Sequence, residues 1–327
     1  MSKKRLGILR GGLGSEYDIS LKTGENVLNN LAQNPDYELH DILITKDGTW
    51  HHRGLPVAPG DLPERVDLIF NALHGDFGED GEVQNILDDI NLPYTGVGRE
   101  SALLTINKDK TKELLKDHGI LTPYGLTLEV TNPDDDALAY EVFSRVSPPW
   151  VIKPVNKGSS VGVYQAFDFP NLRESIKKAS RFSSRVLVEE FIRGREATCG
   201  LIEDFRNNKT YTLPVSEILK SKDQPIWNYE DKYSGATNIM CPATFLDEEK
   251  YQIQEIAKRA SEVLGLRHYC RADFILSPRG VYLLEINSLP DLSPNSTFVK
   301  SFESIGLEAP QFLDHIVKLA SRDREDV

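Results

Sequence analysis

Strand-like apolar runs alternate with helical patterns through the first third of the chain, and this alternation restricts the fold more than any other feature. The spacing of apolar residues predicts three strands and two helices, at residues 5–9, 20–32, 38–45, 66–73 and 81–90. Strands that alternate with helices usually form a parallel sheet with helices on both faces. We therefore predict a small doubly wound α/β domain over residues 1–105.

The other two thirds of the chain follow a different pattern, in which shorter strands pair as hairpins between helices. A helix is expected at 108–119, ending at a glycine. Because 327 residues exceed the size of one typical core, we predict two further α+β units, a central subdomain at 106–200 and a C-terminal subdomain at 201–327. The loop at 220–242 is long for an unstructured connection, and loops of this length often serve as lids.

Composition excludes several classes of protein. The formal net charge is −12, whereas nucleic-acid-binding proteins usually carry a basic face. No apolar run is long enough to span a bilayer, and the first residues lack a signal-peptide core. The three cysteines, Cys199, Cys241 and Cys270, form no CxxC pair, so free thiols in a reducing cytosol are expected. The sequence predicts a cytoplasmic enzyme that binds neither nucleic acid nor membrane.

The segment at 271–296 carries the strongest chemical signal. Its two short apolar runs flank the turn SPRG, which predicts a hairpin. Glu285 and Asn287 are two residues apart on one strand and must project to the same side, and Asp273 lies on the partner strand. If Asp273 faces the same way, three oxygen ligands suited to Mg²⁺ converge. The alternative is a half-buried hairpin whose polar residues face water.

A glycine-rich turn at 153–163 is the second signal. Its sequence, KPVNKGSSVGV, places Lys153 at a strand end before Gly158, Ser159 and Ser160. Backbone N–H groups in such a turn can surround phosphate oxygens, and the lysine supplies positive charge. The pattern differs from that of a P-loop. The alternative is an ordinary hairpin turn rich in glycine and serine.

The segment RVLVEEFIRGREATCGLIE predicts two strands around a turn, and its acidic residues suggest where a nucleoside could bind. Glu189 ends the first of these strands, where the edge of an adenine or ribose can be recognised, and a carboxylate such as Glu196 commonly holds ribose hydroxyls. For Glu190, Arg193 and Arg195 we favour a solvated charged turn.

Together these segments resemble the D-alanine–D-alanine ligase family of the ATP-grasp superfamily, and the resemblance runs nearly end to end. The matching motifs are GGLGSEYDIS, NALHGDFGEDGEVQ, NKDKTK, VIKPVNKGSSVGV, VLVEEFIRGREAT, YEDKYSGATNIMCPA and RADF…LLEINSLPDLSPNS. The resemblance implies an ATP-grasp fold of three domains, with ATP between the sheets of the central and C-terminal subdomains.

The resemblance also implies a reaction. The γ-phosphate of ATP would pass to the carboxylate of one D-alanine, and the amino group of a second D-alanine would attack the resulting acyl phosphate to give a cell-wall dipeptide. The partners implied are ATP, two D-alanines per turnover and two Mg²⁺ ions, with Mn²⁺ as an alternative metal, in a homodimer. Glu285 would bridge the two metal ions.

Roles for individual residues follow from the same resemblance. The residues that match the family's ATP contacts are Lys108, Lys153, Ser159, Ser160, Glu189, Phe191, Ile192, Glu196 and Lys232. The residues that match its catalytic groups are Glu16, Ser159, Tyr233 and Arg271, where Glu16 binds the first ammonium and Arg271 stabilises the oxyanion. The residues that match its other substrate contacts are His74, Ser296 and the backbone of Asp291. Structural alternatives are that His74 caps a strand end, that Tyr233 packs as a loop aromatic and that Lys232 is solvated.

Two positions depart from the family's pattern. Gly14 stands where the family pattern GGxSxE has a serine, and Asp291 follows Pro290 where a glycine is usual. We expect the Asp291 side chain to turn outward, since a carboxylate aimed at the oxyanion would repel it. The departures leave two alternatives open: a ligase whose second substrate is D-lactate or D-serine, and a non-catalytic nucleotide-binding ATP-grasp protein. The lid tyrosine, Tyr233, favours an amine nucleophile.

Overall fold

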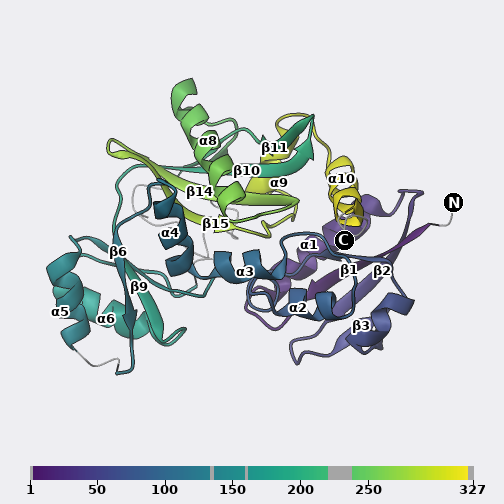
Figure 1. The fold of residues 1–327 in the computed structure, drawn as a ribbon, viewed down its shortest axis with the longest axis horizontal. Coiled ribbons are helices and arrows are strands. Elements are labelled where there is room, and N and C mark those ends of the chain that lie inside the picture. Colours follow the sequence, from purple (N-terminus) through teal and green to yellow (C-terminus); the bar gives the residue numbers. More distant parts are fainter. Residues whose placement is uncertain (1–2, 133–135, 159–160, 220–237, 323–327) are drawn as a thin grey trace.

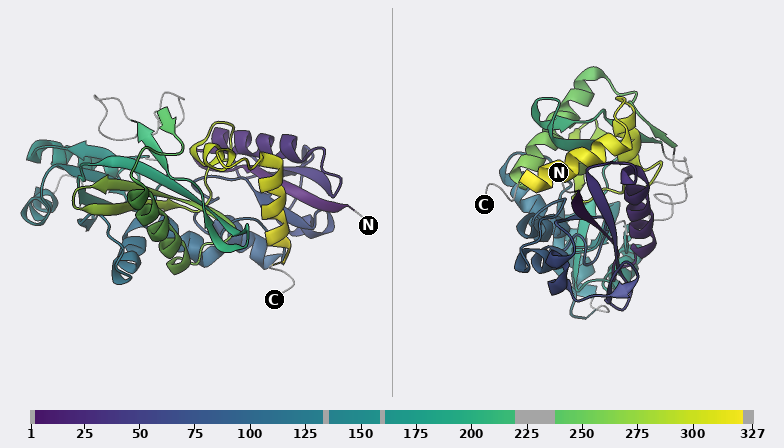
Figure 2. Two further views of the ribbon diagram at one scale, coloured as in Figure 1. Left: turned by 90° about the horizontal axis from the view of Figure 1, so that it is seen from above. Right: turned by 90° about the vertical axis from the view of Figure 1, so that its right-hand side faces the viewer.

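The computed structural model describes residues 3–132, 136–158, 161–219 and 238–322, and these residues form three β-sheets joined by helices (Figure 1). One sheet lies in the first part of the chain, a four-stranded sheet lies in the middle, and a six-stranded sheet follows. Viewed from above, the four-stranded sheet and the N-terminal sheet lie at opposite ends of an elongated molecule (Figure 2).

The N-terminal sheet has the strand order β4-β3-β2-β1-β5. Its strands are β1 (Lys4–Gly11), β2 (Tyr37–Ile44), β3 (Trp50–His52), β4 (Leu55–Pro56) and β5 (Leu68–Asn71). Its helices are α1 (Tyr17–Leu31), a 3₁₀ turn (Pro59–Glu64), α2 (Glu82–Asp89) and, from the far end of the chain, α10 (Ala309–Arg322). β1 pairs in parallel with β2 and β5, whereas β3 and β4 extend one edge as antiparallel strands. The predicted strands and helices of this region are confirmed.

Both faces of this sheet are covered, because successive strand residues point to opposite sides. Leu6, Ile8 and Phe70 pack with α1 and α10 on one face, and Leu9 and Ile69 pack with α2 on the other. The doubly wound prediction is therefore confirmed. The covering helix α10 comes from residues that the sequence alone did not connect with this sheet.

The four-stranded sheet is antiparallel, with the order β6-β9-β7-β8. Its strands are β6 (Gly125–Glu129), β7 (Trp150–Pro154), β8 (Tyr164–Ala166) and β9 (Arg185–Glu190), and its helices are α5 (Asp136–Arg145) and α6 (Phe169–Ala179). The fully buried Trp150 lies in the core between this sheet and its helices. β7 and β8 are the two strands that flank the predicted phosphate turn.

The six-stranded sheet has the order β13-β12-β10-β14-β15, and β11 also pairs with β10. Its strands are β10 (Arg195–Phe205), β11 (Asn208–Thr212), β12 (Ser216–Leu219), β13 (Asn238–Met240), β14 (Tyr269–Ser277) and β15 (Gly280–Asn287). Helix α8 (Asp247–Val263) packs on one face of this sheet. β9 and β10, predicted as two strands around a turn, belong to different sheets, and β10 runs through residue 200. The predicted domain boundaries remain predictions.

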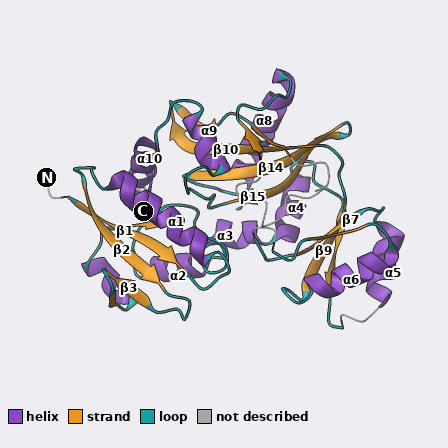
Figure 3. Cartoon of the chain, turned by 180° about the vertical axis from the view of Figure 1, so that it is seen from behind, coloured by secondary structure: helices purple, strands orange, loops and turns teal. Residues whose placement is uncertain are grey.

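Three more helices connect these sheets: α3 (Arg99–Ile106), α4 (Lys108–Asp117) and α9 (Thr297–Glu303). The Asn107 side chain accepts a hydrogen bond from the Lys110 N–H and so caps the start of α4. Seen from behind, α4 lies between β15 and the four-stranded sheet (Figure 3). This position places the side chains of α4 next to both sheets.

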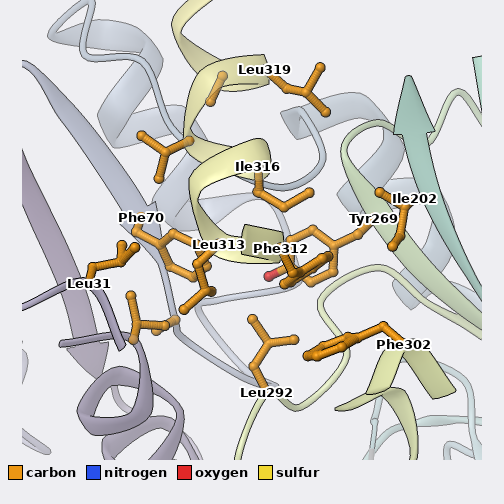
Figure 4. Packing of buried hydrophobic residues seen from close by; sticks show 14 of the residues in the cluster. Leu31, Phe70, Ile202, Tyr269, Leu292, Phe302, Phe312, Leu313, Ile316 and Leu319 are labelled. Carbon is orange, nitrogen blue, oxygen red and sulfur yellow. The ribbon is translucent and has the colours of Figure 1, made fainter. Parts of the chain in front are cut away.

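One hydrophobic core joins the N-terminal sheet to the six-stranded sheet (Figure 4). Phe312 of α10 stacks on Phe302 of α9, with ring centroids 4.9 Å apart, and meets Tyr269 of β14 edge-on. Leu31 and Phe70 contribute from the N-terminal side. The two sheets are therefore packed together through α9 and α10.

Three further sequence predictions concern membrane spans, the cysteines and the lid. Among the described residues, no helix is long and apolar enough to cross a membrane. Cys199, Cys241 and Cys270 are free. Most of the predicted lid, residues 220–237, lies outside the described residues, and the lid's last part includes β13.

Candidate active site

Four polar residues lie on one face of the β14–β15 hairpin. Arg271 pairs directly across from Asn287, and Asp273 pairs across from Glu285. Cross-strand partners project to the same side, so the three predicted metal ligands and the predicted oxyanion-stabilising arginine share a face. A β-bulge follows Asp273 and changes which side chains of the next residues share that face.

Farther along the hairpin the same face becomes apolar. Ile275 pairs with Tyr282 beyond the bulge, and both pack against Ile192, with Leu284 beside them. Ile192, a predicted ATP contact, thus lies near the apolar end of a surface whose other end is charged.

Asp273 is held by two donor side chains, one charged and one neutral. Arg271 Nε and Nη2 donate to its two carboxylate oxygens, each at 2.9 Å, and the Thr198 hydroxyl donates to Oδ1 at 2.7 Å. Arg271 and Asp273 are both buried. A two-pronged arginine–carboxylate contact fixes the direction of both side chains. The active-site arginine is therefore already oriented by the residue predicted to bind metal.

The hairpin fits a Mg²⁺ site by the chemistry of its donors. Asp273 and Glu285 offer carboxylate oxygens, and Asn287 offers an amide oxygen, which also accepts the Leu289 N–H at 3.0 Å. Carbonyl and carboxylate oxygens keep a second lone pair when they accept one hydrogen bond. Within the described residues no group of three or more His, Cys, Asp or Glu is arranged to hold a metal ion. The candidate set has only two carboxylates, and so it suits a metal that also binds substrate phosphate.

A cavity lies between α4 and β15. Its lining includes Lys108 and Lys112 of α4, Glu285 and Asn287 of β15, and Gly158 of the glycine-rich turn. The Lys108 ammonium donates to the backbone carbonyl of Lys157. The cavity therefore brings a lysine, a glycine-rich turn and the candidate metal ligands into one space, which we call the α4–β15 cavity.

Glu189, at the end of β9, lies between two lysines. Its carboxylate contacts Lys112 of α4 and Lys153 of β7, the second at 2.5 Å. Burial alone would raise the pKa of Glu189, but the two ammonium groups more than offset this and the pKa lies below its ordinary value. Burial lowers the pKa of Lys112 to about 8, although Glu189 partly opposes that change. Two of the predicted ATP contacts, Glu189 and Lys153, are thus brought together by an ion pair.

Two carboxylates, Glu16 and Glu79, meet on the N-terminal side. Glu16 is buried at the start of α1, and Glu79 accepts the Gly75 N–H at 2.9 Å. Gly75 has φ +64°, and a side chain there would lie 2.1 Å from Glu16 Oε2, so only glycine fits. Burial and the nearby Glu16 charge raise the pKa of Glu79 to about 8. This pair of carboxylates is suited to binding a cation.

His74 connects three segments. Its Nε2 lies 2.8 Å from the Thr23 hydroxyl of α1, and its Nδ1 lies 3.1 Å from the Leu289 carbonyl. The predicted substrate-site histidine therefore joins α1 and the end of β5 to the loop after the β14–β15 hairpin, which carries the candidate metal ligands and is called the metal-ligand hairpin below.

Asp291 uses its carboxylate locally. It accepts hydrogen bonds from the Ser293 N–H at 2.7 Å, the Ser293 hydroxyl at 2.7 Å and the Thr23 hydroxyl at 3.1 Å. Its backbone carbonyl accepts from Ser296 Oγ at 2.7 Å, and Ser296 also caps α9. These contacts hold the Asp291 side chain against α1 and its own loop, and the expected orientation away from the oxyanion stays a prediction.

The structure places the other predicted residues as follows. Phe191 donates its N–H to the Pro149 carbonyl at 2.8 Å, and Glu196 lies in β10 beside Ile275 of β14. Four predicted residues lie outside the described residues: Ser159, Ser160, Lys232 and Tyr233.

Sequence reasoning missed four residues at this site: Asp76, Glu79, Lys112 and Lys157. All four lie inside motifs already recognised, HGDFGEDGE, NKDKTK and KPVNKGSSVGV. A search for charged residues within those motifs would have found them, but their pairing depends on contacts between different sheets.

Comparison with known proteins identifies the family. The family model described as "D-ala D-ala ligase C-terminus" matches residues 114–318, and the model described as "D-ala D-ala ligase N-terminus" matches residues 55–97. The chain belongs to the D-alanine–D-alanine ligase family. It is 33% identical over 319 residues to D-alanine–D-alanine ligase B of Clostridium perfringens, with 96% of this chain and 97% of that protein covered.

Solved structures of this ligase family match the fold. The VanG D-Ala:D-Ser ligase of Enterococcus faecalis has a TM-score of 0.85 at 27% identity and covers 98% of this chain and 100% of its own. The Bacillus anthracis D-alanine–D-alanine ligase complexed with ATP has a TM-score of 0.81 at 25% identity, with 99% of each chain covered. The predicted ATP-grasp fold is confirmed, and the chain is an ATP-dependent ligase of this family.

Proposed function

We propose that this ligase joins two D-alanines to form D-alanyl-D-alanine, through a D-alanyl phosphate intermediate. One observation carries the proposal: the α4–β15 cavity collects Lys108, Gly158, Glu285 and Asn287 around one space. Phosphoryl transfer to a carboxylate requires cations and N–H donors around crowded negative charge. The similarity to the D-alanine–D-alanine ligase B of C. perfringens supports D-alanine as the substrate.

ATP would lie along the β14–β15 face. Its base would meet the apolar end formed by Ile192, Ile275 and Tyr282, and its phosphates would meet the charged end at Glu285 and Asn287. Glu189 and Lys153 would contact the nucleoside from the four-stranded sheet. Asp273, Glu285 and Asn287 would hold two Mg²⁺ ions, and bound Mg²⁺ supplies positive charge that offsets repulsion between the triphosphate and the acceptor carboxylate.

The first D-alanine would bind by its ammonium to the Glu16–Glu79 pair. Burial and the Glu16 charge raise the pKa of Glu79, and a bound ammonium would offset that repulsion between the two carboxylates. A carboxylate oxygen of this substrate attacks the γ-phosphorus of ATP, and the bond from that phosphorus to ADP breaks. The products of this step are ADP and an acyl phosphate.

The second D-alanine then attacks the acyl carbon through its unprotonated amine. Arg271, fixed by Asp273, would stabilise the oxyanion, and Ser296 would orient the second carboxylate. The carbon–oxygen bond to phosphate breaks, and the dipeptide, inorganic phosphate and one proton are released. Ser159 and Tyr233, proposed to assist the amine, lie outside the described residues.

The test is ADP release from ATP and Mg²⁺ in the presence of D-alanine, with the dipeptide measured by mass spectrometry. We expect ADP and dipeptide in equal amounts, and a hydroxamate of D-alanine when hydroxylamine traps the intermediate. Glu285→Gln should abolish both products. The control Glu141→Gln, which removes a surface ion pair with Arg145, should leave them unchanged. Absence of ADP with every D-amino acid would reject the proposal in favour of a non-catalytic nucleotide-binding protein.

A second candidate differs only in the second substrate. The structural similarity to the VanG D-Ala:D-Ser ligase favours D-serine as the competitor to examine. Assays that pair D-alanine with D-serine or D-lactate across a range of pH would distinguish these second substrates. D-alanine and D-serine give amides of different mass, whereas D-lactate gives an ester. A dominant D-alanyl-D-serine or D-alanyl-D-lactate product at equal concentrations would replace the primary proposal. Sedimentation would test the proposed homodimer.

A further inference from the structure

An ion pair joins two sheets beside the candidate site. Lys157, in the turn after β7, donates to Asp76 Oδ1 at 2.9 Å and to Asp76 Oδ2 at 2.7 Å. Asp76 lies in the loop after β5, in the N-terminal sheet. The two side chains are about equally accessible, with exposed fractions of 30% and 40%. The contact therefore links the N-terminal α/β region to the four-stranded sheet near solvent.

Both partners of this ion pair lie next to residues of the proposed site. The backbone carbonyl of Lys157 accepts the Lys108 ammonium. A Cβ on the next residue, Gly158, would lie 3.7 Å from Glu16 Oε2 and 3.9 Å from Glu79 Oε2. The turn that carries Lys157 thus lies directly over the two carboxylates proposed to bind the first ammonium.

Asp76 is similarly close to that carboxylate pair in sequence and in space. It follows His74 and Gly75, and Gly75 donates its N–H to Glu79. Any shift of Asp76 would be transmitted to the loop that holds Glu79. The ion pair consequently connects two segments that border the Glu16–Glu79 pair, the loop that carries Asp76 and the turn that carries Lys157.

Gly14 explains how Asp76 reaches this position. A Cβ at residue 14 would lie 3.2 Å from Asp76 Cβ and 3.3 Å from Asp76 N, which is closer than ordinary van der Waals contact. The family pattern has a serine at this position. The absence of a side chain at Gly14 leaves room for the Asp76 loop. The glycine at residue 14 therefore helps Asp76 to reach Lys157.

We propose that Asp76 and Lys157 are positioning residues that hold the glycine-rich turn over the Glu16–Glu79 pair and thereby set the affinity for the first amino-acid substrate. The identity of that substrate rests on the proposed function. The ion pair touches neither the metal-ligand hairpin nor the apolar nucleotide end in the contacts described above. Its loss should therefore raise the KM for the first D-alanine more than the KM for ATP, although the same turn carries Gly158 of the α4–β15 cavity, with little change in kcat.

The expected effect is moderate because the pair is partly exposed. Exposed ion pairs typically contribute about 0.2–1 kcal/mol. The two charge-assisted hydrogen bonds from Lys157 to Asp76 place this pair toward the upper end of that range. Removing either charge should raise the KM for the first D-alanine by roughly three- to fivefold. Salt screens charges near solvent, so the difference from the unmodified protein should shrink in 0.5 M NaCl.

The test compares Asp76→Asn, Lys157→Met and the charge-reversed double variant Asp76→Lys/Lys157→Asp. Initial rates over a grid of ATP and D-alanine concentrations give separate constants for ATP and for each D-alanine. The two single variants should show the same selective rise, and the double variant should recover most of it. Gly14→Ser should reproduce the rise by crowding Asp76. The matched controls are Arg5→Met and Asp67→Asn, which break a two-pronged ion pair of similar exposure, 35% and 39%, inside the N-terminal region.

Three results would overturn the proposal. The single variants could behave like the Arg5 and Asp67 controls. Lys157→Met alone could raise the KM for ATP, which would make Lys157 a phosphate contact. The charge-reversed protein could show the summed loss of both single changes, which would mean that the two charges do not act on each other.

A measurement without turnover separates this inference from the proposed function. Hydrogen exchange of the backbone at residues 75–78 and 155–158 reports on the two connected segments. Faster exchange in both segments of both single variants supports the ion pair as a positioning contact even if no D-amino acid is a substrate. Unchanged exchange in either segment rejects it.

Discussion

Glu189 and Glu79 are both carboxylates beside the α4–β15 cavity, yet their surroundings drive them in opposite directions. Glu189 lies between Lys112 and Lys153, and its pKa is lowered although burial opposes this. Glu79 lies beside Glu16, and burial and that like charge raise its pKa to about 8. The comparison shows that burial raises the pKa at both positions, and that the neighbouring charges reinforce this effect at Glu79 but outweigh it at Glu189.

The difference assigns each carboxylate a distinct physical role. Glu189 stays ionised and keeps two lysines ordered between α4 and the four-stranded sheet. Glu79 holds a proton near neutral pH and can lose it when a cation arrives. A site that binds an anionic nucleotide on one wall and an ammonium on the other needs both kinds of carboxylate.

The largest expected effect comes from removing the charge of Glu189. Glu189→Gln leaves two buried lysines without a counter-ion, and breaking a buried pair in this way costs about 3–5 kcal/mol of unfolding free energy. Urea unfolding followed by tryptophan fluorescence measures it, since Trp150 is buried in the same sheet. Glu129→Gln is the control, because Glu129 pairs with Arg185 on the surface, and its cost should stay below about 1 kcal/mol.

The pH dependence of the Glu189 effect has a fixed sign. A carboxyl group whose folded pKa is lowered stabilises the fold above its unfolded pKa, and this stabilisation is lost as the pH falls through the folded pKa. The difference between the parent protein and Glu189→Gln should therefore shrink below the ordinary glutamate pKa of 4.5. A difference that stays constant down to acid unfolding would contradict the assignment.

For Glu79 we expect an effect on stability of intermediate size, and the substitution should stabilise the protein at alkaline pH instead of destabilising it. Its folded pKa is raised, so the parent protein loses stability as the pH rises from the ordinary value of 4.5 to about 8. Glu79→Gln cannot ionise and should gain roughly 3–4 kcal/mol of stability relative to the parent between pH 5 and pH 8, since a difference of one in pKa corresponds to about 1.4 kcal/mol. Thermal unfolding at pH 5 and pH 8 checks this, and parallel behaviour of the two proteins would refute it.

The smallest effect is expected for Asp291, a carboxylate held by neutral donors. Asp291→Gly removes the acceptor of three hydrogen bonds from Thr23 and Ser293 and should cost about 1 kcal/mol of stability. If the side chain points away from the oxyanion, as we predict, the turnover rate should change by less than roughly tenfold, or about 1.4 kcal/mol. Steady-state rates measure this, and a gain of several orders of magnitude would show instead that Asp291 suppresses the reaction.

Much of the hairpin at the site was predictable from the sequence. Glu285 and Asn287 share a face because strands have a period of two, and the short SPRG turn brings Asp273 opposite Glu285. The bulge after Asp273 was not predictable, since it depends on how the two strands twist together. Ile192 also packs with Ile275 and Tyr282 at the apolar end of the hairpin face, a contact that residue spacing alone did not indicate.

Contacts between distant segments account for what the sequence did not reveal. Helix α3 was missed because its apolar residues form no clear stripe. β9 and β10 read as one hairpin, but they diverge into separate sheets. Lys112 and Asp76 lie within recognised motifs, yet their ion pairs form only when α4 meets β9 and when the loop after β5 meets the turn after β7.

Helix α10 also has a consequence for biosynthesis. It covers one face of the N-terminal sheet with Phe312, Leu313 and Ile316, which pack near Leu6, Ile8 and Phe70. On the ribosome that sheet and α1 emerge long before α10 does, so the part of the apolar face that α10 covers stays unprotected until almost the whole chain has been made. The first region to be synthesised is thus one of the last to be finished, and a nascent chain that stops before residue 309 would present this surface to chaperones and proteases.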